Sequence, residues 1–193
     1  MDGLSAFILA GGKSSRMGTE KGLIPFRGKP LIQHLIATLA ELGIKPVIIG
    51  HHPEYHQFEI SVVGDLIPDK GPMGGIFTAL SHSVSSHALI LSCDSPLIQT
   101  GTLKKLITMK SNSIVVGQRE ERIYPFPGIY PASILPQVKR YLEENKLKLQ
   151  AFILDQAHQI IPLDQISSQP EAEFTNFNFP SDLLPWEDHR END

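Results

Sequence analysis

Short apolar runs rich in branched side chains recur along this chain, and amphipathic stretches separate them. The runs cover residues 6–9, 46–49, 60–63, 88–91 and 113–116. Continuous apolar runs of this length are typical of strands that are buried on both faces, as in parallel sheets. The intervening stretches have helical periodicity, at residues 31–43, 73–83, 100–109 and 133–144. In the first of them, Leu31, Leu35 and Leu39 lie on one stripe, and Gly43 is suited to end the helix in a left-handed conformation.

This alternation predicts an α/β fold, with an open, mostly parallel, Rossmann-like sheet flanked by helices on both faces. Residues 22–30 are predicted to form a hairpin with its turn at Arg27 and Gly28, residues 123–130 a returning strand, and residues 167–173 a loop. We expect a single domain over residues 1–185 and a charged, frayed tail over 186–193. Ligands of such sheets bind beyond the carboxyl ends of the strands, so the loops there are the first place to look for chemistry.

The composition and net charge of the chain argue against several classes of protein. The chain has 193 residues and a net charge of −4, whereas a protein that binds nucleic acid usually carries a basic excess. No apolar run approaches the ~18 residues of a membrane helix, so neither nucleic acid nor a membrane is an expected partner. The single cysteine excludes a disulfide within the chain, and no signal peptide is evident at the N-terminus, which together favour the cytoplasm.

The loop after the first apolar run has the composition of a phosphate-binding segment. Gly11 and Gly12 allow backbone N–H groups to approach an anion closely, and Lys13, Arg16 and Lys21 supply three cations. The P-loop pattern fails here, because its first glycine is replaced by Phe7. The dinucleotide-binding pattern fails as well, since the two glycines are adjacent. We therefore predict a triphosphate site of another type.

An acidic residue follows the fourth apolar run at the same predicted edge of the sheet. Asp94 comes directly after Ser92 and Cys93. Mg²⁺ is commonly held by one carboxylate together with substrate phosphates, so Asp94 is the predicted magnesium ligand. Cys93 is predicted to be a buried spacer, because no basic partner that would activate its thiol is evident nearby.

At this point several motifs resemble those of the molybdenum cofactor guanylyltransferases. These are Leu9-Ala10-Gly11-Gly12 with Arg16-Met17-Gly18 and Lys21, Gly28-Lys29-Pro30-Leu31, Gly71-Pro72-Met73-Gly74-Gly75, Cys93-Asp94-Ser95-Pro96 and Asn176-x-Asn178-x-Pro180-x-Asp182-Leu183. The family belongs to a superfamily of Rossmann-like nucleotidyl- and sugar-nucleotide transferases. The resemblance spans nearly the whole chain.

The resemblance implies transfer of GMP from GTP to the phosphate of molybdenum-molybdopterin, with release of pyrophosphate. It also implies roles for individual residues. Arg16, Lys21 and Asp94 would be catalytic, with Mg²⁺ on Asp94. The residues that would bind substrates are Leu9, Ala10, Gly11, Gly12, Lys21, Asp65, Gly71, Gly75, Asp94, Asn176 and Asn178. The asparagines would serve the pterin side or the metal side. Transient contacts with molybdenum-insertion and molybdoenzyme-maturation proteins are also implied.

Two alternative functions are compatible with the same residues. The family often has an asparagine near the base, where this chain has His51 and His52, so a cytidylyl- or sugar-nucleotide transferase is the first alternative. The second is an accessory protein that binds a nucleotide without chemistry. Retention of Arg16, Lys21 and Asp94 weighs against it.

Overall fold

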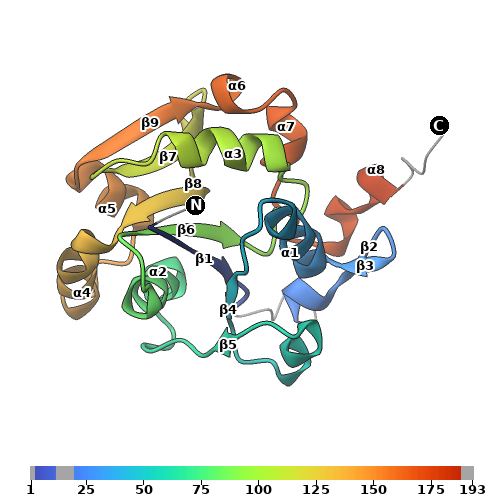
Figure 1. Ribbon diagram of the computed structural model, residues 1–193, viewed down its shortest axis with the longest axis horizontal. Helices are drawn as coiled ribbons and strands as arrows, with labels where there is room; N and C mark the ends of the chain where they lie inside the picture. Colours follow the sequence, from blue (N-terminus) through green and yellow to red (C-terminus); the bar gives the residue numbers. More distant parts are fainter. Residues whose placement is uncertain (1–2, 12–19, 188–193) are drawn as a thin grey trace.

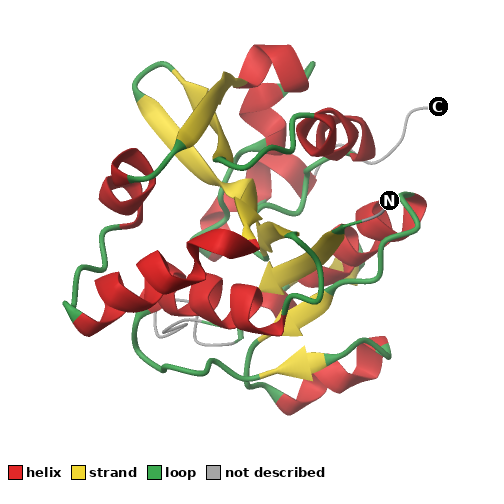
Figure 2. Ribbon diagram, turned by 60° about the vertical axis from the view of Figure 1, so that its left-hand side comes forward, coloured by secondary structure: helices red, strands yellow, loops and turns green. Residues whose placement is uncertain are grey.

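A seven-stranded sheet forms the centre of the molecule, with helices on both of its faces (Figures 1 and 2). The computed structural model describes residues 3–11 and 20–187. The strands of the main sheet are β1 (Leu4–Leu9), β4 (Val47–Ile49), β5 (Val62–Val63), β6 (His87–Ser92), β7 (Ile114–Arg119), β8 (Arg122–Pro131) and β9 (His158–Pro162). Their spatial order is β5-β4-β1-β6-β8-β7-β9.

Eight α-helices and several short 3-10 segments connect the strands of the described chain. The α-helices are α1 (Leu31–Glu41), α2 (Gly71–His82), α3 (Thr100–Thr108), α4 (Leu135–Glu143), α5 (Leu149–Asp155), α6 (Leu163–Ile166), α7 (Pro170–Glu173) and α8 (Leu184–Glu187). The 3-10 segments are η2 (Lys21–Leu23), η3 (Pro53–Phe58), η4 (Ala132–Ile134) and η5 (Pro180–Asp182). In accord with the predicted stop, Gly43 follows α1 with a φ of +69°.

The sheet is mostly parallel, as the sequence predicts. β1 pairs in parallel with β4 and β6, and β4 with β5. Only β8 runs against the others, since it is antiparallel to both β6 and β7, while β9 is parallel to β7. The carboxyl ends of β1, β4, β5 and β6 therefore meet at one edge.

Alternate side chains of β1 enter two separate cores, which explains its continuous apolar sequence. Ala6 and Ile8 pack on the face covered by α1, α3 and α6. Phe7 and Leu9 pack on the opposite face, under α2, α4 and α5. A strand buried on both faces has no polar position, so its pattern is a continuous apolar run.

A small hairpin precedes α1, in agreement with the prediction. Its strands are β2 (Pro25–Phe26) and β3 (Lys29–Pro30). The turn residues Arg27 and Gly28 both have positive φ, 48° and 77°, which is the geometry that matches the twist of a two-residue hairpin. The hairpin packs on the C-terminal segment through a third cluster that contains Phe26, Leu31, Phe177 and Leu183.

Several elements were not predicted from the sequence, among them β9, α5 and α7. β9 is absent from the prediction, because this edge strand is only partly buried and has just two adjacent isoleucines as an apolar signal. The predicted loop at 167–173 contains α7, and the carboxylate of Glu173 accepts hydrogen bonds from the backbone N–H of Gln99 (3.0 Å) and from Ser167 Oγ (2.5 Å). A tertiary contact of this kind leaves no periodic trace in the sequence. Among the described helices, none has both the length and the apolar character needed to span a bilayer.

Candidate active site

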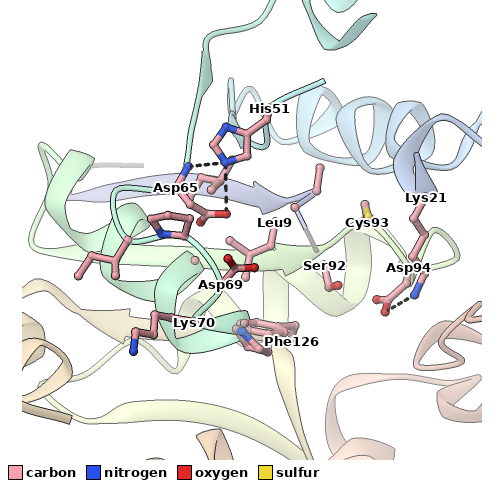
Figure 3. A pocket seen from close by; sticks show the side chains of 18 residues that line it. Leu9, Lys21, His51, Asp65, Asp69, Lys70, Ser92, Cys93, Asp94 and Phe126 are labelled. Carbon is pink, nitrogen blue, oxygen red and sulfur yellow. Dashed lines mark hydrogen bonds and ion pairs between the residues drawn. The ribbon is translucent and has the colours of Figure 1, made fainter. Parts of the chain in front are cut away.

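A cavity of about 660 Å³ lies at the edge where the carboxyl ends of the parallel strands meet (Figure 3). This volume suits a small-molecule ligand. The predicted site residues that line it are Leu9, Ala10, Gly11, Lys21, Asp65, Gly71, Gly75 and Asp94. Gly12 and Arg16 lie outside the described residues.

The pairing of β1 with β6 places the predicted metal ligand Asp94 beside the end of β1, and the predicted cation Lys21, from η2, meets it there. Leu9 lies opposite Ser92, and the backbone N–H of Cys93 donates to the carbonyl of Leu9 at 3.0 Å. Asp94 therefore lies next to the end of β1. Its Oδ2 accepts a hydrogen bond from Lys21 Nζ at 3.0 Å, and only 20% of the lysine side chain and 16% of the aspartate side chain are exposed. The ion pair is thus partly shielded from water at the cavity wall.

A second ionisable pair lines another side of the cavity (Figure 3). The carboxylate of Asp65 is half-buried, and burial raises its pKa above the ordinary value of 3.8, while His51 opposes this shift. His51 Nε2 lies 3.8 Å from Asp65 Oδ2 and accepts a hydrogen bond from the backbone N–H of Asp65 at 3.4 Å. His52 instead accepts a hydrogen bond from the N–H of Glu54 and begins η3. Of the two histidines, His51 is therefore the one that faces the site.

Three of the predicted glycines line the cavity, and the reason that favours glycine differs among them. A Cβ atom on Gly11 would lie 3.0 Å from Asp65 Oδ2, and one on Gly75 would lie 3.0 Å from the two Cδ atoms of Leu9. Gly71 is the first residue of α2 and has a φ of +56°, which favours glycine. α2 therefore presents its N-terminal turn to the cavity, where the helix dipole favours anions.

The two predicted asparagines adjoin the site without being among the residues that line the cavity. Asn178 Oδ1 accepts a hydrogen bond from Lys21 Nζ at 2.9 Å. Asn176 Oδ1 accepts one from Ser95 Oγ at 2.8 Å, and between them the N–H of Phe177 donates to the carbonyl of Asp94 at 2.8 Å. The C-terminal segment is thus bonded to the residues that carry the ion pair.

Some lining residues were not predicted from the sequence. Phe126 reaches the cavity from β8, and Asp69 and Lys70 from the turn before α2. Their positions depend on the antiparallel return of β8 and on the approach of α2, so no local motif marks them. Cys93, in contrast, is the buried spacer that was predicted, and burial raises the pKa of its thiol well above the ordinary range.

The donor set at Asp94 fits a magnesium ion whose remaining ligands come from a substrate. Within residues 3–11 and 20–187, no group of three or more histidine, cysteine, aspartate or glutamate side chains is placed to hold a metal ion. One carboxylate beside a cavity of this size suits Mg²⁺, which commonly combines one or two carboxylates with phosphate oxygens and water.

The chain matches a known protein family over most of its length. Residues 6–160 match the model of the MobA-like NTP transferase domain. A protein of Flavobacterium johnsoniae named as a probable molybdenum cofactor guanylyltransferase is 40% identical, over 95% of this chain and 96% of its own length. One of Carboxydothermus hydrogenoformans with the same name is 33% identical, over 94% of each.

Solved structures support the fold. The molybdopterin-guanine dinucleotide biosynthesis protein A of Archaeoglobus fulgidus superposes with a TM-score of 0.81, over 95% of this chain and 96% of that one, at 20% identity. The superposition shows that the two proteins share a fold.

Proposed function

The chain belongs to the MobA-like NTP transferase family, and we propose that it transfers GMP from GTP to the phosphate of molybdenum-molybdopterin and releases pyrophosphate. Relatives named as molybdenum cofactor guanylyltransferases support this activity, because they match almost the full length of the chain. The chain is therefore an enzyme of the nucleotidyltransferase class.

One observation carries the assignment of the chemistry to this cavity. Lys21 and Asp94 are 73 residues apart in the sequence, yet their charged groups meet at 3.0 Å at the cavity wall. A cation beside a metal-binding carboxylate suits a reaction that transfers a nucleotidyl group from one anionic partner to another, because both groups can offset charge on the phosphates.

The proposed mechanism relies on positioning and charge rather than on a base. The attacking group is a phosphate, which is already largely anionic near neutral pH because its second pKa is about 6. Lys21 would neutralise charge that develops on the phosphates, and Arg16, which lies outside the described residues, is predicted to do the same. When bound at Asp94, Mg²⁺ would supply a Lewis acid that polarises the phosphates.

Nucleotide recognition is assigned to the other side of the cavity. The backbone of Leu9, Ala10 and Gly11 lies at the end of β1, and Asp65 and His51 line the wall beside it. We propose that this group binds the guanosine, and that His51 takes the place of the asparagine often found in the family. The N-terminal turn of α2, with Gly71 and Gly75, would border the substrate.

The test is a turnover assay with purified protein, Mg²⁺, molybdenum-molybdopterin and either GTP or CTP. We expect a guanine dinucleotide product and pyrophosphate with GTP, and little product with CTP. Asp94→Ala should abolish turnover. Preferential use of CTP would move the function to a cytidylyltransferase, whereas turnover by Asp94→Ala at the parent rate would remove Asp94 from the mechanism.

Further aspects of the function are proposed on the same basis. GTP and molybdopterin are the proposed small-molecule substrates, and the proteins that insert molybdenum and mature molybdoenzymes are proposed as transient partners in the cytoplasm. The division into one domain over residues 1–185 and a charged tail over 186–193 also stays a prediction.

A further inference from the structure

Residues 176–182 lie between α7 and α8 (Figure 1), and Asn176, Phe177 and Asn178 bond them to the residues of the site. Phe177 anchors this segment, since its side chain is fully buried against Phe26 with ring centroids 5.3 Å apart. The neighbouring residue Asn178 is exposed, yet its side chain holds Lys21. An exposed amide needs a further constraint if its oxygen is to stay at one point.

Asp182 supplies that constraint. Its Oδ2 accepts hydrogen bonds from two successive backbone N–H groups, those of Asn178 at 2.8 Å and Phe179 at 2.9 Å. The N–H of Asp182 donates in turn to the carbonyl of Phe179 at 2.9 Å. A carboxylate that caps two adjacent amides closes a local turn and fixes the dihedral angles of the residues within it.

These contacts form a continuous series from Asp182 to the site. The carboxylate of Asp182 holds the backbone of Asn178, the amide oxygen of Asn178 holds Lys21 Nζ at 2.9 Å, and Lys21 Nζ holds Asp94 at 3.0 Å. Lys21 thus has two oxygen acceptors that come from distant parts of the chain. If a metal–nucleotide complex engages Asp94, the acceptor on Asn178 still keeps the ammonium group at the cavity wall.

We propose that Asp182 is a positioning residue for the transfer reaction, which acts by fixing Asn178 so that Asn178 keeps Lys21 in place. The inference rests on the proposed function for its consequence in catalysis. The structural link from Asp182 to Lys21 does not depend on which substrate the enzyme uses. The experiment therefore has one readout for the link and another for turnover.

The first readout is the rate at which trinitrobenzenesulfonate labels the amine of Lys21, measured by peptide mass spectrometry. The hydrogen bond from Lys21 to Asn178 contributes about 1 kcal/mol, and Asp182→Ala should weaken it. The labelling rate of Lys21 should therefore rise about three- to tenfold. Asn178→Ala should raise it by a similar factor. Asp182→Asn, which retains an acceptor oxygen of the same reach, should stay near the parent rate, and Glu171→Ala is the control because Glu171 pairs with Arg119 instead.

The second readout is kcat/KM in a double-mutant cycle. Because Asp182 is proposed to act through Asn178, the double variant Asp182→Ala/Asn178→Ala should be no worse than Asn178→Ala alone. Asp182→Glu retains the charge but displaces the acceptor oxygen by one methylene, so its kcat/KM should fall as in Asp182→Ala. It replaces the alanine variant in the cycle if that variant does not fold. Asp182→Asn should keep kcat/KM near the parent value, because its amide oxygen can accept the same backbone hydrogen bonds.

The outcomes separate the two claims. Multiplicative losses in the cycle, or unchanged labelling of Lys21 in both Asp182→Ala and Asp182→Glu, would overturn the positioning role. Increased labelling in a protein whose parent form transfers no nucleotide would overturn the proposed function and leave the link between Asp182 and Lys21 intact.

Discussion

Replacement of Lys21 by methionine separates the contribution of the central ion pair to catalysis from its contribution to stability. The substitution keeps most of the aliphatic stem and removes the ammonium group that bonds Asp94 and Asn178. Loss of one preorganised donor at a reacting phosphate costs about 3–4 kcal/mol of transition-state stabilisation. We therefore expect kcat/KM for GTP to fall by about 10²–10³-fold in Lys21→Met.

The expected effect on folding is much smaller. Both partners of the pair keep some exposure, 20% for Lys21 and 16% for Asp94, so water can solvate the carboxylate that is left. Partly exposed pairs of this kind contribute about 1 kcal/mol or less, and we expect the melting temperature to fall by no more than about 4 °C.

Pyrophosphate release under subsaturating GTP measures the first quantity, and thermal unfolding of the ligand-free protein measures the second. Lys104→Met on α3 is the matched control, because this exposed lysine lies outside the cavity. A Lys21→Met enzyme within threefold of the parent kcat/KM would refute the reasoning. So would a loss of activity that merely follows a large loss of stability.

Three further predictions concern the nucleotide side and the C-terminal segment. Burial raises the pKa of Asp65, so its ionised carboxylate destabilises the ligand-free fold above that pKa. Asp65→Asn should therefore raise the melting temperature slightly at pH 7, and this gain should shrink as the pH falls toward 3.8. The same variant should bind GTP more weakly in calorimetry. Gly11→Ala should weaken GTP binding about tenfold with little change in melting temperature, because its methyl group would displace the Asp65 carboxylate; unchanged affinity would remove that contact from recognition. Phe177→Ala should cost about 3–5 kcal/mol in chemical denaturation, whereas Phe179→Ala, at a side chain that is 45% exposed, should change stability by less than about 0.5 kcal/mol.

The architecture could be predicted because its causes are local and periodic. Strands buried on both faces must be apolar throughout, and helices that cover them must carry an apolar stripe, so β1, β6 and α1 are all evident in the sequence. The turn at Arg27–Gly28 could be predicted for a similar reason, since positive φ favours particular residues. β9 and α7 could not, because their stability comes from pairing with β7 and from contacts of Glu173 with Gln99 and Ser167.

Several of the residue types that line the site could also be predicted from the sequence. The adjacent glycines, the lysine that follows them and an aspartate after a buried strand are properties of motifs, and the rule that ligands bind at the carboxyl ends of parallel strands placed them at one edge. These two motifs, together with the rule on where ligands bind, predicted that Lys21 and Asp94 belong to one site.

How these groups are held depends on the packing of the folded chain. The sequence does not reveal that His51 rather than His52 faces Asp65, that Phe126 closes a wall of the cavity, or that Asp182 reaches Lys21 through Asn178. Each of these contacts joins segments far apart in the chain, and its geometry is set by packing of whole elements. Local patterns reflect the environment of a residue, but the identity of its neighbour depends on the path of the entire chain.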